Sequence, residues 1–200
     1  MQHRRSSITS YDFLITTFRK KTHAKSIIVG ATSGIGKELA LQLLAKGWEL
    51  GIAGRRTERL EEIKAKAPEK IRIRRIDVRS DDAASDLLAL IADLGGMDLY
   101  VHCSGIGCQN MELNPDAELN TVATNVDGFV RLVDCAFSYF LGNGGGHLCI
   151  ISRLPAQKAS EPPVLTQPQR RSEHLSGRSG ATVCDATVPD DLHRRETRLR

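Results

Sequence analysis

The chain has 200 residues, of which 40% are hydrophobic and 26% are charged, and this composition is typical of a globular domain. No apolar run approaches the roughly eighteen residues that a membrane-spanning helix needs, so we expect no transmembrane segment. The five cysteines form no C-x-x-C pair, which argues against a disulfide framework or a zinc ribbon. We therefore expect a cytoplasmic protein that has no membrane partner.

The net charge of +4 is distributed unevenly along the chain. Residues 1–25 carry six Lys or Arg and one acidic residue, and residues 153–200 carry nine Lys or Arg and six acidic residues. Residues 26–152 carry thirteen Lys or Arg and seventeen acidic residues, so the body of the protein is acidic. Because no aromatic residue accompanies the basic residues of the C-terminal segment, we expect no nucleic-acid partner.

Neither end of the chain has the pattern of a packed domain. Residues 1–25 contain a single apolar patch and are predicted to be a disordered basic extension, with a transit peptide or a start codon assigned too early as alternatives. Residues 153–200 hold five of the seven prolines, no aromatic residue and no sustained periodicity, which is typical of disorder. The folded domain is therefore predicted to span residues 26–152.

Apolar runs alternate with helical periods through this middle segment. Strands are predicted at residues 26–29, 48–53, 71–76, 99–102 and 147–151, and helices at residues 34–46, 57–67, 81–94 and 115–140. Thr57 and Ser80 are the expected N-caps of the second and third helices, and Gly47 closes the first. The alternation predicts an α/β fold, a Rossmann-like doubly wound parallel sheet that is incomplete at about five strands.

The first strand-to-helix turn reads Gly30-Ala31-Thr32-Ser33-Gly34-Ile35-Gly36. Glycines in such a turn let the backbone approach a pyrophosphate, whose charge is met by free N–H groups and by the positive end of the helix. The turn is not a Walker A loop, because Glu38 stands where that motif has its magnesium-binding Ser or Thr. A tight structural turn is the alternative, but the strand before it and the helix after it favour a dinucleotide site.

With the residues downstream, this G-x-x-x-G-x-G turn resembles the short-chain dehydrogenase/reductase family over residues 26–152. The resemblance implies that Asp77 contacts the adenine and that Asn125, in the long helix, supports a proton relay. Taken singly, these two residues could also be a strand-end turn and a polar helix residue. The resemblance assigns cofactor binding to Gly30, Thr32, Ser33, Gly34, Ile35, Gly36, Arg55, Arg56, Asp77, Val78, Cys103, Ser104 and Gly105.

The residues after the second strand indicate which nicotinamide cofactor is preferred. An NAD enzyme would place Asp or Glu there to accept hydrogen bonds from the ribose hydroxyls, but this chain has Arg55 and Arg56. An acid would repel a 2′-phosphate, whereas a guanidinium can bind it through paired charge-assisted hydrogen bonds. We therefore expect NADP rather than NAD, with Arg55 as the principal contact, and two solvated arginines at a helix start are the alternative.

One motif departs from the family. The usual Asn-Asn-Ala-Gly after the fourth strand is His102-Cys103-Ser104-Gly105 here. Gly105 keeps the close approach to the cofactor, whereas His102 and Cys103 cannot reproduce the hydrogen bonds of an Asn amide. Because no third ligand lies near them in the sequence, we interpret both as packing residues and predict no metal site.

The resemblance also implies a catalytic Ser, a Tyr that transfers the proton, and a Lys four residues after the Tyr that lowers the pKa of the phenol. The expected position of the Ser falls near Arg153, and Lys follows none of Tyr11, Tyr100 and Tyr139 at the required spacing. Of the proton-transfer set, only Asn125 is present. We therefore expect the chain as written to be inactive.

The tail suggests a reason for this absence. Synonymous codons for residues 165–170, read in a frame shifted by one base, permit Tyr-Ser-Ala-Thr-Lys, and the same shift permits Ser at the junction of residues 152 and 153. The shifted Ser and Tyr would lie thirteen codons apart, which is the spacing that the family uses. We therefore interpret residues 153–200 as out-of-frame translation after a one-base deletion near codon 152, either in the gene or in its sequencing.

Together these observations predict an oxidoreductase lineage that transfers a hydride between NADP(H) and a small carbonyl or alcohol substrate, in a chain without its Ser-Tyr-Lys residues. A non-catalytic NADP-binding or regulatory protein with a genuine tail is the alternative. An incomplete sheet would leave apolar surface uncovered on the long helix and on the fifth strand, with poor solubility as the consequence. Neither the substrate nor the oligomeric state is predicted.

Overall fold

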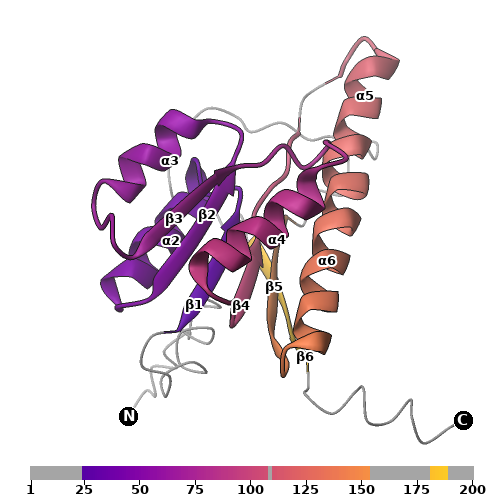
Figure 1. Ribbon diagram of the computed structural model, residues 1–200. Helices are drawn as coiled ribbons and strands as arrows, with labels where there is room; N and C mark the ends of the chain where they lie inside the picture. The colour runs from indigo at the N-terminus through magenta and orange to yellow at the C-terminus, as the bar shows by residue number, and fades with distance from the viewer. Residues whose placement is uncertain (1–23, 108–109, 154–180, 189–200) are drawn as a thin grey trace, which may run out of the picture.

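The computed structural model describes residues 24–107, 110–153 and 181–188 (Figure 1). The predictions for the N-terminal extension therefore lie outside the described residues, apart from its last two positions. In chain order the elements are β1 (Lys25–Val29), α2 (Gly34–Ala45), β2 (Glu49–Gly54), α3 (Thr57–Lys64), β3 (Ile71–Arg75), α4 (Ala83–Leu94), β4 (Leu99–His102), α5 (Pro115–Val122), η1 (Ala123–Asp127), α6 (Gly128–Gly142), β5 (Gly146–Arg153) and β6 (Ala181–Val188).

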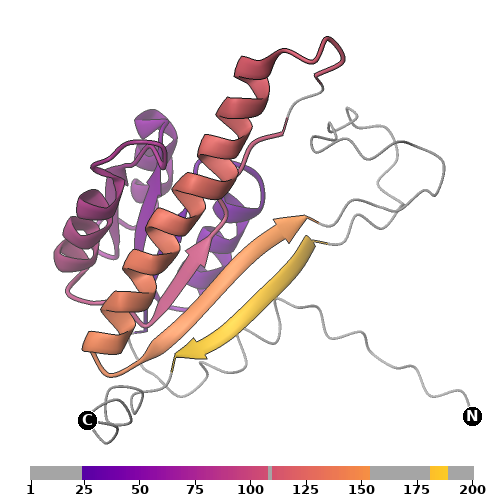
Figure 2. The same cartoon turned by 90° about the vertical axis from the view of Figure 1, so that its right-hand side faces the viewer.

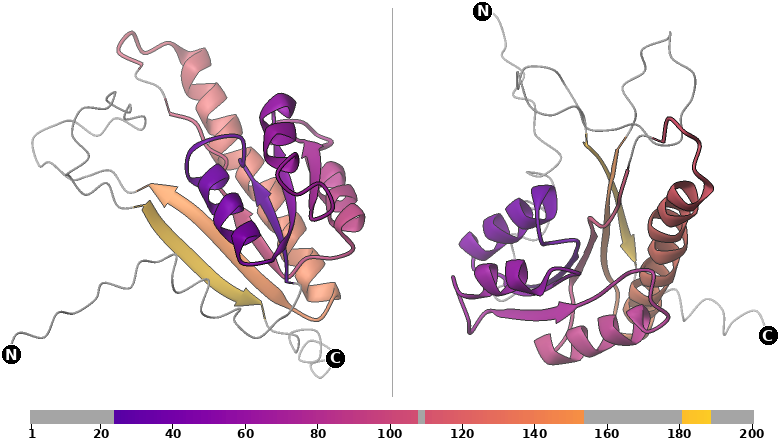
Figure 3. Two further views of the ribbon diagram at one scale, coloured as in Figure 1. Left: turned by 90° about the vertical axis from the view of Figure 1, so that its left-hand side faces the viewer. Right: turned by 90° about the horizontal axis from the view of Figure 1, so that it is seen from above.

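The strands form one sheet in the order β3-β2-β1-β4-β5-β6. The first five strands in this order are mutually parallel, which confirms the predicted doubly wound sheet. The strand order reverses between β1 and β4, and ligands of such sheets bind at the carboxyl ends of the strands beside this switch point. Helices α2 and α3 cover one face, and α4 and α6 cover the other (Figure 3).

Each face of the sheet has its own core, because successive residues of a strand point to opposite faces. Ile27 and Val29 of β1 pack with the α4 and α6 side, while Ile28 packs with the α2 and α3 side. All three side chains are buried, as expected for a parallel strand with helices on both faces. The two cores hold the carboxyl ends of β1 and its neighbours in fixed positions.

Strand β6 lies within the segment that was predicted to be a disordered tail. It runs antiparallel to β5, pairing Gly146 with Val188 and Arg153 with Ala181, so that the two form a long ribbon at the sheet edge (Figure 2). Its sequence contains two Val and two Thr, whose branched side chains favour strands, and the open edge of β5 offers unpaired backbone groups. The proline-rich average of the segment hid this strand. The rest of the predicted tail, residues 154–180 and 189–200, lies outside the described residues.

Two helix starts differ from the sequence prediction. Helix α3 has Arg56 at its N-cap, so Thr57 is its first residue and not its cap. Helix α4 begins at Ala83 with Asp82 as its N-cap, and the Ser80 hydroxyl instead accepts a hydrogen bond from the Asp82 backbone N–H (3.3 Å). At Ser80 the difference arises because a Ser can close the turn before a helix as readily as it caps the helix.

The long predicted helix is observed from Pro115 to Gly142, but it contains the π-helical segment η1. Asn114 caps it, accepting a hydrogen bond from the Asp116 N–H at 2.9 Å. Where α6 begins, a Cβ on Gly128 would lie 2.7 Å from Val78 Cγ2. Only glycine therefore lets this helix lie against the loop that follows β3.

Apolar side chains are exposed along the long helix, as the incomplete sheet predicted. They are Leu119, Val122, Val126, Val130 and Phe137. The corresponding prediction for the fifth strand is wrong, because Leu148 and Cys149 of β5 are buried and β6 pairs along the whole strand. Every helix in the described ranges is too short or too polar to span a bilayer.

Candidate functional site

A polar depression of about 140 Å³ lies where β1, β2, β3 and β4 end. Its position is the switch point of the sheet, where the turns after β1 and β4 diverge. The lining residues are Val29, Gly30, Thr32, Ser33, Gly54, Arg55, Arg56, Ile76, Asp77, Val78, Cys103, Ser104, Gly105 and Thr124. We call this depression the switch-point pocket.

The glycine turn after β1 forms the floor of the switch-point pocket. Gly30 has φ +92°, and a Cβ there would lie 2.7 Å from the carbonyl carbon of Cys103. A Cβ on Gly36 would lie 2.4 Å from the Gly30 carbonyl oxygen. Two glycines are therefore required for the turn to pack between the start of α2 and the end of β4.

The N-terminus of α2 faces this turn without a side-chain cap. Ser33 is the N-cap residue, but no side-chain hydrogen bond closes the first turn. The backbone N–H groups of a first helical turn have no partner within the helix, and they carry a partial positive charge. This arrangement fits the pyrophosphate of a dinucleotide, whose charge the free N–H groups at the start of α2 can meet.

Two arginines stand on the β2 side of the pocket. The Arg56 guanidinium donates hydrogen bonds to Thr32 Oγ1 (2.8 Å) and to Ser33 Oγ (2.7 Å), so it lies over the glycine turn. Arg55 lines the pocket and has neither a hydrogen bond nor an ion pair within the described residues. The two side chains thus place two positive charges beside the turn, and Arg55 is available for an anionic ligand.

Asp77 also lines the pocket, two residues after the end of β3. Arg79 holds it in a fork, donating from Nε to Oδ1 (3.1 Å) and from Nη2 to Oδ2 (2.8 Å). This hydrogen bonding lowers the pKa of Asp77 to about 2, against the opposing effect of burial. The remaining Arg79 nitrogen, Nη1, donates to Asn120 Oδ1 of α5 at 2.8 Å. Asp77 is therefore an anchored carboxylate.

Asn125 lies in η1, beside the pocket residue Thr124. Its Nδ2 donates to the Ile106 carbonyl oxygen (2.7 Å), and its Oδ1 accepts from the Ile106 N–H (2.9 Å). Both polar atoms of the side chain thus fix the loop after β4, where Gly105 also lines the pocket. The π-helical turn brings the amide to this loop, and such turns are frequent at functional sites.

The structure places His102 and Cys103 differently, since Cys103 is partly buried and lines the switch-point pocket. His102 is buried, with Nδ1 2.9 Å from the Tyr100 hydroxyl and its ring edge-on to Phe129. Burial lowers the pKa of His102 to about 4 and raises the pKa of Cys103 to about 12, so both are neutral near pH 7. In the described part of the chain, no three His, Cys, Asp or Glu side chains gather as a metal-binding group.

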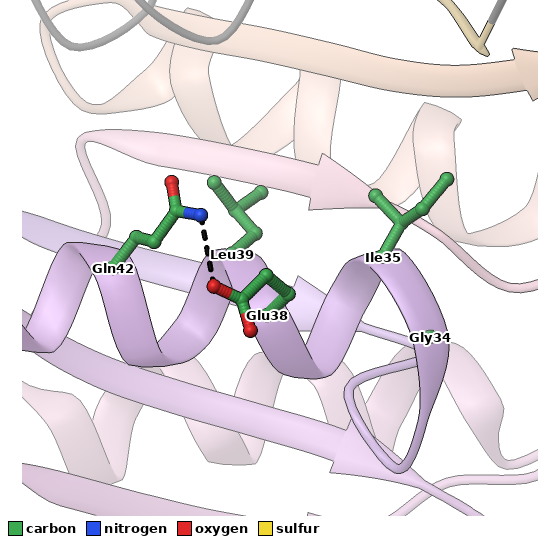
Figure 4. A pocket seen from close by; sticks show the side chains of 5 residues that line it. All are labelled: Gly34, Ile35, Glu38, Leu39 and Gln42. Carbon is green, nitrogen blue, oxygen red and sulfur yellow. Dashed lines mark hydrogen bonds between the residues drawn. The ribbon is translucent and has the colours of Figure 1, made fainter. Parts of the chain in front are cut away.

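Most of the predicted cofactor-binding residues come together. The switch-point pocket is lined by ten of them: Gly30, Thr32, Ser33, Arg55, Arg56, Asp77, Val78, Cys103, Ser104 and Gly105. Gly36 is buried beneath the turn. Gly34 and Ile35 instead line a second depression of about 340 Å³ along α2, with Glu38, Leu39 and Gln42 (Figure 4).

Four lining residues were not predicted: Val29, Gly54, Ile76 and Thr124. Gly54 carried a usable signal, since it ends β2 directly before the two arginines. A Cβ on Gly54 would lie 2.6 Å from Thr32 Cγ2, so this glycine lets the turn approach β2. Val29 and Ile76 follow from strand ends, whereas Thr124 depends on where the long helix packs.

The chain is similar to known proteins over most of its length, not only at the pocket. Residues 25–161 match the family described as short chain dehydrogenase. An uncharacterized oxidoreductase of Mycobacterium tuberculosis (strain ATCC 25618 / H37Rv) is 32% identical over 142 residues, which cover 66% of this chain and 56% of that protein. The chain thus spans little more than half the length of that relative.

Solved structures share the fold. A variant of actinorhodin polyketide ketoreductase with NADPH is 28% identical with a TM-score of 0.56, and covers 62% of this chain and 51% of its own. A 3-ketoacyl-(acyl-carrier-protein) reductase from Brucella melitensis complexed with NADH is 25% identical with a TM-score of 0.57, covering 60% and 51%. These neighbours therefore include proteins with either nicotinamide cofactor.

Proposed function

The chain belongs to the short-chain dehydrogenase family, and from this premise we propose that its switch-point pocket binds NADP(H). The observation that carries the proposal is the pair Arg55 and Arg56, which line the pocket where an NAD-binding protein has an acid. In an intact relative, the bound nicotinamide exchanges a hydride with a carbonyl or alcohol carbon. The residues of this chain supply the nucleotide subsites.

The pyrophosphate subsite rests on the glycine turn and the start of α2. Gly30 and Ala31 donate backbone hydrogen bonds to the Ala53 carbonyl (2.9 and 3.1 Å), so the turn is fixed before any ligand arrives. A pre-organised turn does not have to be ordered on binding, which favours affinity. Ser33 and the uncapped first turn of α2 then meet the phosphate charge.

The 2′-phosphate subsite rests on the two arginines. Arg56 already crosses to Thr32 and Ser33, so its guanidinium lies between β2 and the glycine turn. Arg55 has no partner among the described residues, and a dianionic 2′-phosphate would give it one. Hydrogen bonds to charged groups contribute about 1.5–3 kcal/mol, so we expect NADP to bind at least about tenfold more tightly than NAD.

Titration calorimetry with NADP+ and with NAD+ tests this proposal. The R55A variant should lose most of the preference for NADP+. The R56A variant should lose a smaller part, because the Arg56 guanidinium is already hydrogen-bonded to Thr32 of the turn. Arg72→Ala is the matched control, since Arg72 is hydrogen-bonded to backbone carbonyls at the start of β3, away from the pocket. Equal affinity of the unmodified protein for the two nucleotides would contradict the proposal.

We further propose that the chain as written binds the nucleotide but does not turn over a substrate, since it lacks a Ser-Tyr-Lys set at the family spacing. This proposal keeps the hypothesis of a frame shift near codon 152. Resequencing the locus tests it, because the nucleotides of codons 165–170 either permit Tyr-Ser-Ala-Thr-Lys in the shifted frame or do not. Restoring the frame should then give NADP(H)-dependent reduction of a carbonyl compound.

One observation favours the alternative of a non-catalytic NADP-binding protein with a genuine tail. Strand β6 comes from the tail and pairs with all eight residues of β5. Protection of the β6 amides in hydrogen exchange, together with NADP+ binding and no turnover, would support this alternative over a damaged enzyme.

A further inference from the structure

A negative charge stands in a pocket that we propose for a ligand with a phosphate. Asp77 lines the switch-point pocket together with Arg55 and Arg56. Arg55 is one of the charges that keep the pKa of Asp77 low, so the two side chains lie within electrostatic reach of each other. An unshielded carboxylate here would repel a 2′-phosphate and would also compete for Arg55.

Arg79 forms an ion pair with this carboxylate. Its guanidinium meets both oxygens of Asp77, and its backbone N–H donates to Oδ1 as well (3.2 Å). Such a fork has the geometry that a guanidinium and a carboxylate prefer. Arg79 itself is not among the residues that line the pocket.

A second contact holds the fork in place. Arg79 Nη1 donates to Asn120 Oδ1 (2.8 Å), which belongs to α5, 41 residues further along the chain. Four of the donors of Arg79 are therefore engaged: three with Asp77 and one with Asn120. The ion pair is tied to two separate elements, which limits the loss of side-chain entropy that weakens most surface pairs.

We propose that Arg79 is a specificity-determining residue for the nucleotide: by binding both oxygens of Asp77, it leaves Arg55 free to bind a 2′-phosphate. The inference rests on the proposed function and adds a residue that does not touch the ligand. Without Arg79, Asp77 draws Arg55 to itself, and NADP loses affinity while NAD, which has no 2′-phosphate, is less affected.

The test is a double-mutant cycle with the full chain at pH 7, read as the ratio of the dissociation constants for NAD+ and NADP+. Both nucleotides contain adenine, so any lost adenine contact of Asp77 cancels in this ratio. R79A should lower the ratio by roughly tenfold, a coupling within the usual range for charged neighbours. R79A/D77N should restore it to within about twofold of the unmodified protein, because the competing charge is gone.

Further variants separate charge shielding from other roles. Arg79→Lys keeps the charge but not the fork, and we expect a ratio between those of the unmodified protein and R79A. Arg72→Ala, the control used above, removes an equal charge at the far end of β3 and should leave the ratio unchanged. The effect of R79A should shrink as salt is raised, since it arises from exposed charges.

The outcomes are distinct. If the unmodified protein shows no preference for NADP+, the proposed function fails. If the preference exists but R79A leaves it unchanged, the role of Arg79 is overturned and the proposed function stands. If R79A lowers the ratio and D77N does not restore it, Arg79 acts directly on the ligand and the shielding is overturned. Should R79A fail to fold, D77N alone decides, because a fall in its ratio contradicts the competition for Arg55.

Discussion

The two halves of the sheet differ in how completely they build a site. At the ends of β1, β2, β3 and β4, each strand delivers residues to the switch-point pocket, and short hydrogen bonds fix the connecting turns. On the β5 and β6 side, the described residues contribute packing and an edge pair. Binding of a dinucleotide depends on turns that a local sequence can build, whereas proton transfer depends on side chains placed by later segments. The switch-point pocket is therefore built by β1, β2, β3 and β4 and by the turns that follow them.

The largest expected effect is on the glycine turn after β1, whose residues line the switch-point pocket. Gly36→Ala places a Cβ 2.4 Å from the Gly30 carbonyl oxygen, and the clash is with backbone that cannot rotate away. We expect a loss of more than about 3 kcal/mol in the free energy of unfolding, measured by urea denaturation, and loss of nucleotide binding. Gly142→Ala, in which the added Cβ meets nothing within 4 Å, is the control and should be neutral or slightly stabilising.

The buried His102 should make stability depend on pH. Its folded pKa is about 4 against 6.5 for an unperturbed histidine, so the unfolded state binds the proton first as the pH falls. The contribution is present in full above pH 6.5 and is lost on acidification toward pH 4, by about 3 kcal/mol in total. Urea denaturation at several pH values measures this slope. In His102→Gln the slope over this range should become markedly smaller, and an unchanged slope would contradict the assignment.

A moderate effect is expected at the contact between Asn125 of η1 and Ile106 in the loop after β4. Asn125→Ala removes two hydrogen bonds to the loop after β4, and we expect a loss of about 1–2 kcal/mol. The Ile106 amide should then exchange with solvent much faster than in the unmodified protein. Asn143→Ala serves for comparison, because it removes one exposed hydrogen bond at the other end of the helix. An equal rate of Ile106 amide hydrogen exchange in the unmodified protein and in the Asn125 variant would show that the Asn125 side chain does not hold this loop.

The smallest change in folding stability is expected on the exposed side of the long helix. Val126→Lys adds charge to the apolar stripe at a residue that is 51% exposed, and the free energy of unfolding should change by less than about 0.5 kcal/mol. Aggregation, followed by light scattering, should nevertheless decrease. Leu132→Lys, at a buried position of the same helix, should unfold the protein and so shows that only the exposed side tolerates charge.

Much of the switch-point pocket could be predicted because its signals are local. The apolar runs gave five parallel strands, and the glycine spacing identified the turn between β1 and α2. Arg55, Arg56 and Asp77 follow strand ends, and parallel strands bring their carboxyl ends to one edge. Those residues were therefore found without knowledge of any long-range contact.

Other features depend on segments that meet only when the chain folds. The bond between Arg79 and Asn120 spans 41 residues, and the Ile106 contact of Asn125 depends on a π-helical turn within one long helical pattern. Strand β6 was hidden in a segment whose average composition indicates disorder, because its pairing energy comes from the edge of β5.

The sequence alone determined which residues stand at the strand ends, since periodicity and turn chemistry act over a few residues. The tertiary structure alone decided which hydrogen-bond and ion-pair partners those side chains have. It turned Arg56 onto Thr32 and Ser33, left Arg55 without a partner among the described residues, and enclosed Asp77 in the fork of Arg79. The physical reason is that ion pairs and hydrogen bonds form only between groups that are close in space. The packing of helices on both faces of the sheet sets those distances.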